Sequence, residues 1–159
     1  MYITTSRKPS RSTRRFIGIF AGFLNSIYEN RGKKSIDEIV ERAGFLGQNR
    51  IVIVYEKDGL PKRLSFMSIN KYWDWLYPEL ELHIQPNDIL NVEEARKIKR
   101  INKEVLLTGN DSKRYEHLFD FEEPETDDVI TFKIEKGKMS FKYKNHKLAI
   151  KFSSVEKKE

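Results

Sequence analysis

The chain has 159 residues, of which 38% are hydrophobic and 34% charged, and this length suits one domain or two closely packed halves. It contains no cysteine, which excludes a disulfide scaffold, a thiol nucleophile and any cysteine-ligated metal site. The formal net charge is +6, and no apolar run approaches the roughly 18 residues that cross a membrane, so we expect a cytoplasmic globular protein without a membrane segment.

The N-terminal third of the chain predicts a strand and two helices. Residues 2–5 are typical of a short strand. Apolar residues then recur at helical spacing, which predicts a helix over about residues 11–28. A loop at residues 30–34 precedes a second helix, which opens with the capping-box pair Ser35 and Glu38.

The middle and the C-terminal part of the chain predict mostly strands. The apolar run 51–55 and residues 63–69 predict a hairpin, and alternation at 80–84 predicts another strand. A helix-like pattern covers residues 92–107, although its C-terminal part also fits an extended conformation. Residues 129–153 predict a three-stranded meander, with turns at Lys136-Gly137 and Asn145-His146. This order of elements indicates a mixed α/β fold.

The net charge combines two basic ends with an acidic middle. Residues 1–50 hold ten basic and four acidic side chains, and residues 133–159 hold nine lysines and three acids. Residues 51–132 hold eleven basic and seventeen acidic side chains, seven of the acids within 116–128. Basic ends of this strength favour a polyanionic partner, because each phosphate contact releases counterions.

The N-terminal basic residues cluster where the first strand turns into the first helix. Arginines there are unfavourable for the helix alone, because its N-terminus already carries partial positive charge, but together with hydroxyls they suit a phosphate. A glycine in the following loop lets a ligand approach the backbone. The alternative is that these cations pair with the acidic middle. The predicted phosphate-binding residues are Thr5, Ser6, Arg7, Lys8, Ser10, Arg11, Arg14, Arg15, Arg31, Gly32, Lys33 and Lys34.

The C-terminal meander has lysines between its apolar residues, on the opposite face of the sheet. A turn at Asn145-His146 would place Lys144 directly opposite Lys147, which is unfavourable for like charges. Two interpretations remain open: a solvated face that protects the sheet, or a platform that holds RNA backbone without reading its sequence. Lys142, Lys144 and Lys147 are the candidate residues of such a platform.

No pattern in the sequence indicates catalysis, a metal or a cofactor. His83, His117 and His146 lack the paired spacing of metal ligands, and no phosphate-binding P-loop is present. The aromatic group Tyr72, Trp73, Trp75 and Tyr77 could stack on bases, but a core or interface role is the better interpretation. We therefore expect a binding protein and not an enzyme.

Two stretches of the sequence match family signatures. Residues 3–10, ITTSRKPS, lead into a Thr-Arg-x-Phe pattern at 13–16, and residues 30–35, NRGKKS, lead into Glu-Ile at 38–39. The turn at 59–61 fits the hairpin that follows. Over about residues 2–70, the chain resembles the Brix-domain family of ribosome biogenesis proteins, in its archaeal form.

The resemblance implies a single Brix domain over residues 1–159, with an N-terminal half at about 1–85 and a C-terminal half at about 86–159. Each half would resemble the anticodon-binding domain of class II aminoacyl-tRNA synthetases. It also implies a factor in ribosome biogenesis and rRNA processing that binds precursor ribosomal RNA, with ribosomal proteins or other assembly factors as possible partners. Residues 68–73 depart from the Gly-Pro-Thr segment of many eukaryotic members. The alternative function is a scaffold that docks basic ribosomal proteins on the acidic segment 116–128.

Overall fold

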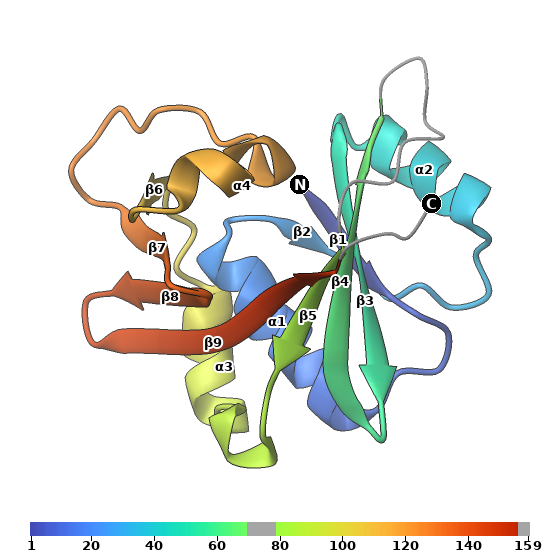
Figure 1. Cartoon of the computed structure of the whole chain (residues 1–159). Helices are drawn as coiled ribbons and strands as arrows, with labels where there is room; N and C mark the ends of the chain where they lie inside the picture. The colour runs from blue at the N-terminus through green and yellow to red at the C-terminus, as the bar shows by residue number, and fades with distance from the viewer. Residues whose placement is uncertain (70–78, 156–159) are drawn as a thin grey trace.

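A computed structural model describes residues 1–69 and 79–155 (Figure 1). The first elements are β1 (Tyr2–Thr5), α1 (Arg11–Phe23), β2 (Ile27–Tyr28), α2 (Ile36–Phe45), β3 (Arg50–Lys57), β4 (Leu60–Ser68) and β5 (Glu79–His83). The remaining elements are η1, a short 3-10 helix (Pro86–Asp88), α3 (Val92–Lys99), β6 (Val105–Thr108), α4 (Ser112–Phe119), β7 (Ile130–Glu135), β8 (Lys138–Tyr143) and β9 (His146–Val155). Within these residues, the strands form one mixed sheet in the order β2-β1-β3-β4-β5-β9-β8-β7-β6. The expectation of a mixed α/β fold is confirmed.

Strand β1 lies between two parallel neighbours, β2 and β3, and both of its faces are covered. Ile3 belongs to the main core together with α1, whereas Tyr2 packs in a second cluster with Ile39 and Ala43 of α2. Alternate side chains of a strand point to opposite faces, so α1 and α2 lie on opposite faces of the sheet. The continuous apolar run of β3 reflects the same two-sided burial.

Helix α1 is shorter than the sequence pattern predicts. It begins at Arg11, as expected, with Ser10 as N-cap, but it ends at Phe23 and not near residue 28. Asn25 adopts a left-handed conformation with φ +48°, which stops the helix. The predicted end was wrong because Ile27 and Tyr28 pair with β1 as strand β2 and satisfy their backbone groups there.

The predicted helix over 92–107 divides into a helix and a strand. Helix α3 ends at Lys99, Asn102 has φ +46°, and Val105–Thr108 then pair with β7 as the parallel strand β6. The extended alternative is therefore correct for the C-terminal part of the pattern. Helix α4 follows β6 at residues that the sequence analysis did not assign to a helix.

The meander of β7, β8 and β9 is confirmed, but its second turn is shifted by one residue. Tyr143 pairs with His146, so the turn residues are Lys144 and Asn145, and Lys144 has φ +52°. The predicted pair of Lys144 and Lys147 is therefore wrong. Lys147 instead lies opposite Lys142, so like charges still face each other across this hairpin.

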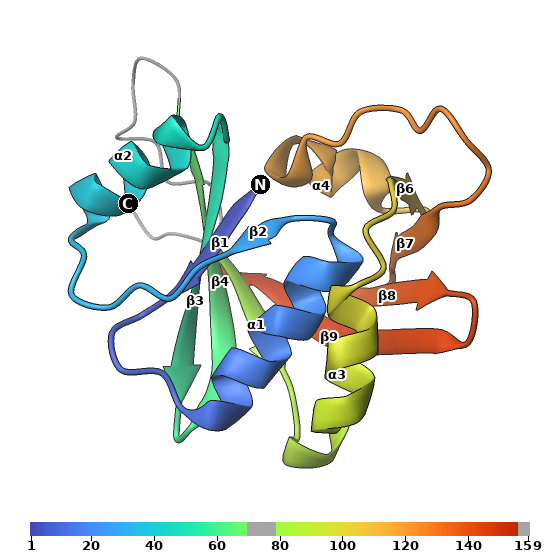
Figure 2. The ribbon, with the colours of Figure 1, turned by 180° about the vertical axis from the view of Figure 1, so that it is seen from behind.

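The main hydrophobic core joins the N-terminal and C-terminal parts of the chain. Strands β5 and β9 pair at the centre of the sheet, and α1 contacts the C-terminal strands through Phe20 and Phe141, whose rings lie 5.9 Å apart. Phe66 of β4 packs edge-on against Phe119 of α4 at 5.4 Å. Helices α1 and α3 lie side by side on one face of the sheet (Figure 2). None of the helices within residues 1–69 and 79–155 is long and apolar enough to span a membrane.

Candidate nucleic-acid interface

Two loops begin at the carboxyl ends of neighbouring strands and lead to opposite faces of the sheet. Because β1 and β2 run parallel, residues 6–10 and 29–35 both follow carboxyl ends of strands at the same edge. The first loop leads to α1 on one face and the second to α2 on the other (Figure 1). Open α/β sheets commonly bind ligands in the crevice between loops that diverge in this way. We call these two segments the diverging loops.

The start of α1, next to the first diverging loop, is capped from within the protein. The Ser10 hydroxyl accepts a hydrogen bond from Thr13 N and donates to Gly59 O at 2.7 Å. A carboxylate oxygen of Glu56 accepts bonds from the Ser10 N–H and from the Thr13 hydroxyl. Burial raises the pKa of Glu56, but these hydrogen bonds outweigh burial and lower it. An acid of β3 thus occupies the helix N-terminus, and any phosphate contact here falls to side chains.

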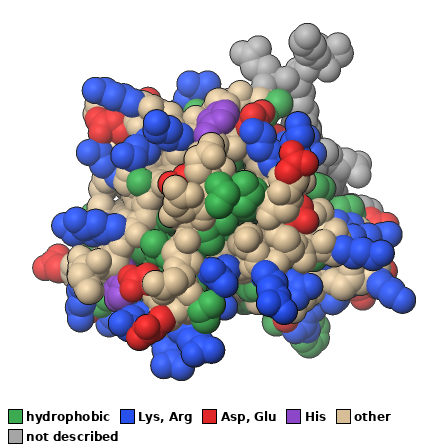
Figure 3. Space-filling view, turned by 90° about the horizontal axis from the view of Figure 1, so that it is seen from below, with side chains coloured by type: hydrophobic (Ala, Val, Ile, Leu, Met, Phe, Trp, Pro, Cys, Tyr) green, Lys and Arg blue, Asp and Glu red, His purple; other side chains and the backbone are tan. Residues whose placement is uncertain are grey.

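The predicted cations gather around the diverging loops. Seen from the side that carries the β3–β4 hairpin, Lys and Arg side chains lie at right in Figure 3, where these loops lie, and also over the rest of this face. The predicted phosphate-binding residues include eight Lys and Arg side chains. Within residues 1–69 and 79–155, none of these eight side chains forms an ion pair with a carboxylate. The exposed members are Arg7, Lys8, Arg11, Arg14 and Lys33, and the partly exposed members are Arg15 and Lys34.

The acidic segment 116–128 pairs with other cations. Asp128 lies 3.0 Å from Lys103, and Asp120 lies 3.7 Å from Arg50. Among the described residues, none of the predicted phosphate-binding cations forms an ion pair with an acid of 51–132, as the alternative required. The cations of the diverging loops therefore keep their charge available to an external anion.

Arg31 is the buried member of the set, with only 8% of its surface exposed. Its Nε donates to Lys34 O at 2.9 Å, closing a turn in which Gly32 has φ +60°. No carboxylate of the described residues lies within ion-pair distance of its guanidinium. Burial of an unpaired charge is costly, and an anion bound at this loop would offset that cost.

Glu29 anchors the start of the second diverging loop. It forms a bidentate pair with Arg42 of α2, at 2.9 and 2.8 Å, and accepts a bond from the Tyr2 hydroxyl at 3.0 Å. The Thr4 hydroxyl donates to its carbonyl. Chiefly through the Arg42 hydrogen bonds, the pKa of Glu29 is lowered to about 2, whereas burial and this carboxylate raise the pKa of Tyr2 to about 12. The loop is thereby tied to both β1 and α2.

Arg14 and Tyr28 connect α1 with the second diverging loop. The Tyr28 hydroxyl donates to Asn30 at 2.7 Å. Its pKa is raised by burial, and the nearby Arg14 charge opposes this effect. Thr5, at the end of β1, is fully buried, and its hydroxyl has no hydrogen-bond partner among the described residues. Arg14 of α1 thus lies near Tyr28, the residue that precedes the second diverging loop.

The lysines of the meander form a separate group on the exposed face of β7 to β9. Lys142 and Lys147 are exposed and lie opposite each other. Lys144 sits over the Tyr143 ring at 5.4 Å, and Lys133 pairs with Glu135 at 2.9 Å. This group lies along the strands of the meander, apart from the diverging loops.

Other predicted features have simpler roles or lie elsewhere. His146 bonds to Glu94 of α3, and His83 bonds to Ser153 at 3.2 Å. No group of potential metal ligands occurs within residues 1–69 and 79–155. The aromatic group Tyr72, Trp73, Trp75 and Tyr77, and residues 70–73 of the departing segment 68–73, lie outside the described residues. Glu29, Arg42 and Glu56 were missed, because single charged residues in a charge-rich sequence carry no motif.

Comparison with known proteins supports the resemblance noted in the sequence. Over 78 residues, the chain is 38% identical to a probable Brix domain-containing ribosomal biogenesis protein of Pyrococcus abyssi, covering 48% of this chain and 34% of that protein. The protein of the same description from Archaeoglobus fulgidus is 40% identical over 75 residues, covering 43% and 49%. The resemblance to the Brix-domain family is confirmed. No family model matches the chain.

Solved structures with the same fold extend the likeness over the whole chain. A probable ribosomal biogenesis protein from Aeropyrum pernix superposes with a TM-score of 0.71 at 17% identity, covering 99% of this chain and 96% of its own. Mil, an archaeal Imp4-like protein, superposes with a TM-score of 0.62 at 19% identity, covering 97% and 96%. The matches to the Brix relatives in sequence span only about a third to a half of their length.

Proposed function

We propose that this protein is a ribosome assembly factor that binds precursor ribosomal RNA through the diverging loops and the start of α1, without catalysing a reaction. The observation that carries the proposal is the gathering of eight cations at one sheet edge, with no acid of the described residues paired to them. Phosphate contacts of this kind supply affinity and orientation but no sequence specificity. Curated relatives described as ribosomal biogenesis proteins support the assignment.

The proposed architecture is a single Brix domain over residues 1–159, with halves at about 1–85 and 86–159. Each half would resemble the anticodon-binding domain of class II aminoacyl-tRNA synthetases. The strand order supports this division, because the antiparallel meanders β3-β4-β5 and β7-β8-β9 meet at the pair β5–β9. The lysines of the second meander would widen the RNA footprint as a weaker, secondary contact.

The salt dependence of RNA binding tests the proposal. We expect the triple variant Arg7→Gln, Arg11→Gln, Arg14→Gln to bind a fluorescent oligouridine of about 20 nucleotides at least about tenfold more weakly at low salt. The slope of log affinity against log salt should fall by about 2, since each lost single-strand phosphate contact removes about 0.7. Fluorescence anisotropy over a NaCl series measures both quantities.

A matched control separates this site from the general charge of the protein. The triple variant Lys138→Gln, Lys142→Gln, Lys147→Gln removes the same charge from the meander, and we expect a smaller loss of affinity. Circular dichroism would establish that both variants are folded. An unchanged slope in the arginine variant, or an equal loss in both variants, would contradict the proposed site.

A further inference from the structure

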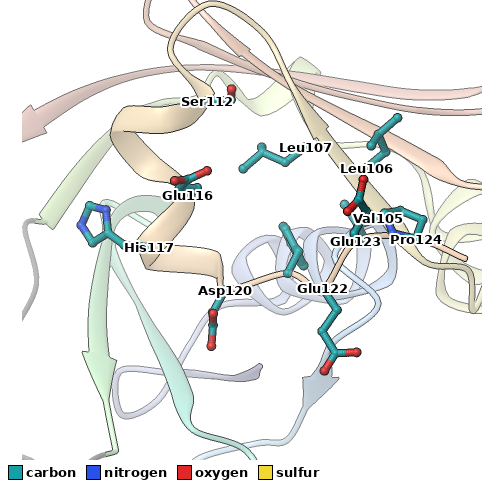
Figure 4. A pocket seen from close by; sticks show the side chains of 11 residues that line it. Val105, Leu106, Leu107, Ser112, Glu116, His117, Asp120, Glu122, Glu123 and Pro124 are labelled. Atoms are coloured by element: carbon teal, nitrogen blue, oxygen red, sulfur yellow. The ribbon is translucent and has the colours of Figure 1, made fainter.

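A groove lies between the edge strand β6 and helix α4, at the opposite end of the strand order from β2. It has a volume of about 470 Å³, and residues 105–107 of β6 line one side of it. Figure 4 shows Glu116 of α4 and Asp120, which directly follows this helix, on the opposite side, with Glu122 and Glu123 on the segment beyond. The groove therefore combines an apolar wall with an acidic rim.

The apolar wall includes an unusually exposed side chain. Leu106 has 40% of its surface exposed. Among the large apolar side chains of the described residues, only those of Phe45 and Val92 are more exposed. A second hollow of about 580 Å³ continues from the groove and shares Asp120 and Glu122 with it. The lined surface is thus long enough for an extended segment of several residues.

Strand β6 is the last strand of the sheet, and its pairing with β7 determines which of its residues have backbone N–H and C=O groups on the free side. Ile130 N donates to Glu104 O at 2.8 Å. In a parallel pair, every second residue of a strand directs its backbone N–H and C=O groups to the same neighbouring strand. Because Glu104 bonds to β7, the backbone groups of Leu106 also point to β7. The N–H and C=O groups of Val105 and Leu107 therefore point away from β7, beside the groove; Leu107 is half-buried and Val105 is 5% exposed. An unpaired edge of this kind is a template for an added strand.

We propose that the edge of β6 and the adjoining groove bind an extended Lys- or Arg-rich segment of a protein partner as an added strand. Charge complementarity selects this occupant. Glu116, Glu122 and Glu123 form no ion pair within residues 1–69 and 79–155, and only Asp120 is paired, with Arg50 at 3.7 Å. Alternate side chains of the segment would contact Leu106 and the acidic rim, and the same rim repels RNA.

Peptides of about ten residues test the proposal. We expect a peptide of alternating Lys and Val to bind the full chain in isothermal titration calorimetry, and a peptide of alternating Glu and Val not to bind. A peptide of alternating Lys and Pro has the same charge but cannot form the ladder, and it should bind much more weakly. Equal binding of the Lys-Pro peptide, or no binding of the Lys-Val peptide, would overturn the proposal.

Variants locate the binding surface. The pair Glu122→Lys, Glu123→Lys should weaken binding of the Lys-Val peptide about tenfold. The pair Glu41→Lys, Glu93→Lys makes the same charge change on α2 and α3 and should leave affinity close to wild type. Equal effects of the two pairs would overturn the assignment to this groove.

The backbone of the edge strand supplies a second readout. On addition of the Lys-Val peptide, we expect hydrogen exchange of the Val105 and Leu107 amides to slow, because both become hydrogen-bonded. Leu107→Pro removes one edge N–H without removing a bond to β7, and it should weaken binding. If this variant does not fold, the exchange measurement on the wild type still decides; unchanged exchange in the presence of bound peptide would contradict strand addition.

Discussion

Glu29 links three elements through a single carboxylate. Its bidentate contact with Arg42 fixes α2, and the bond from the Tyr2 hydroxyl fixes β1. The residue is the first of the diverging loop that carries Arg31 and Lys33, so its contacts position these cations. Charge-assisted bidentate hydrogen bonds are among the stronger polar contacts in proteins, and they also impose geometry.

Glu29→Gln should flatten the acid dependence of stability. The pKa of Glu29 is lowered from 4.5 to about 2 in the folded protein, mainly by the Arg42 hydrogen bonds. Between these values the unfolded chain binds the additional proton, so folded-state stability falls as the pH falls. We expect the variant to melt below the wild type at neutral pH, with the difference in Tm shrinking towards zero at about pH 2.

Thermal unfolding followed by circular dichroism at a series of pH values measures this difference. Glu41→Gln is the matched control, because Glu41 is an exposed acid of α2 without a partner among the described residues. That variant should follow the wild-type pH dependence. A Tm difference for Glu29→Gln that stays constant from neutral pH to about pH 2 would show that the carboxylate does not contribute as proposed.

At the scale of elements, the crossing of α1 and α3 depends on Gly22. A side-chain carbon at Gly22 would lie 2.7 Å from Ile98 O, and one at Gly18 would lie 2.2 Å from the Lys99 side chain. Gly22 therefore lets the two helix backbones approach closely, whereas at Gly18 the neighbouring atoms are the far end of the Lys99 side chain, which can move aside. The approach brings the end of α3 onto α1 and so joins the two halves of the chain.

Gly22→Ala should destabilise the protein, whereas Gly44→Ala should stabilise it. Alanine favours a helix over glycine by roughly 0.5–1 kcal/mol, and nothing lies within 4 Å of a side-chain carbon at Gly44. At Gly22, the clash with the Ile98 backbone should outweigh this gain and lower the free energy of unfolding by about 1–2 kcal/mol. Urea unfolding of both variants measures the two effects; stabilisation by Gly22→Ala would contradict the close approach.

Local sequence signals predicted where elements begin better than where they end. The caps at Ser10 and Ser35 act through bonds to residues three positions on, so the sequence contains the whole interaction. The ends of α1 and α3 depend instead on distant strands: residues 27–28 and 105–108 gain pairing with β1 and β7. Periodicity within a short window does not record such partners.

The candidate site was predictable in its cations but not in their supports. Clustered arginines and the Arg31–Lys34 loop are visible in the sequence, as is the turn made possible by Gly32. Glu56, which caps α1, comes from β3 and reaches the helix only because the strands pair in this register. The single-residue shift of the Lys144 turn likewise depended on pairing that neighbouring turn residues do not determine.

At the scale of the whole molecule, the charges separate along the sheet. The diverging loops, which carry unpaired cations, follow β1 and β2 at one end of the strand order, and the acid-rimmed groove lies beside β6 at the other. Phosphates would be attracted to the first end and repelled from the second. This separation would allow one chain to hold RNA and a basic protein segment at the same time.

Chemical cross-linking of lysines to bound RNA, with the linked peptides identified by mass spectrometry, tests the RNA-binding surface most directly. The lysines are distributed favourably for this purpose: Lys8, Lys33 and Lys34 lie in the diverging loops, and Lys142 and Lys147 lie on the meander. We predict that an oligouridine links first to the lysines of the diverging loops. Links confined to the meander, with none at Lys8, Lys33 or Lys34, would contradict the account.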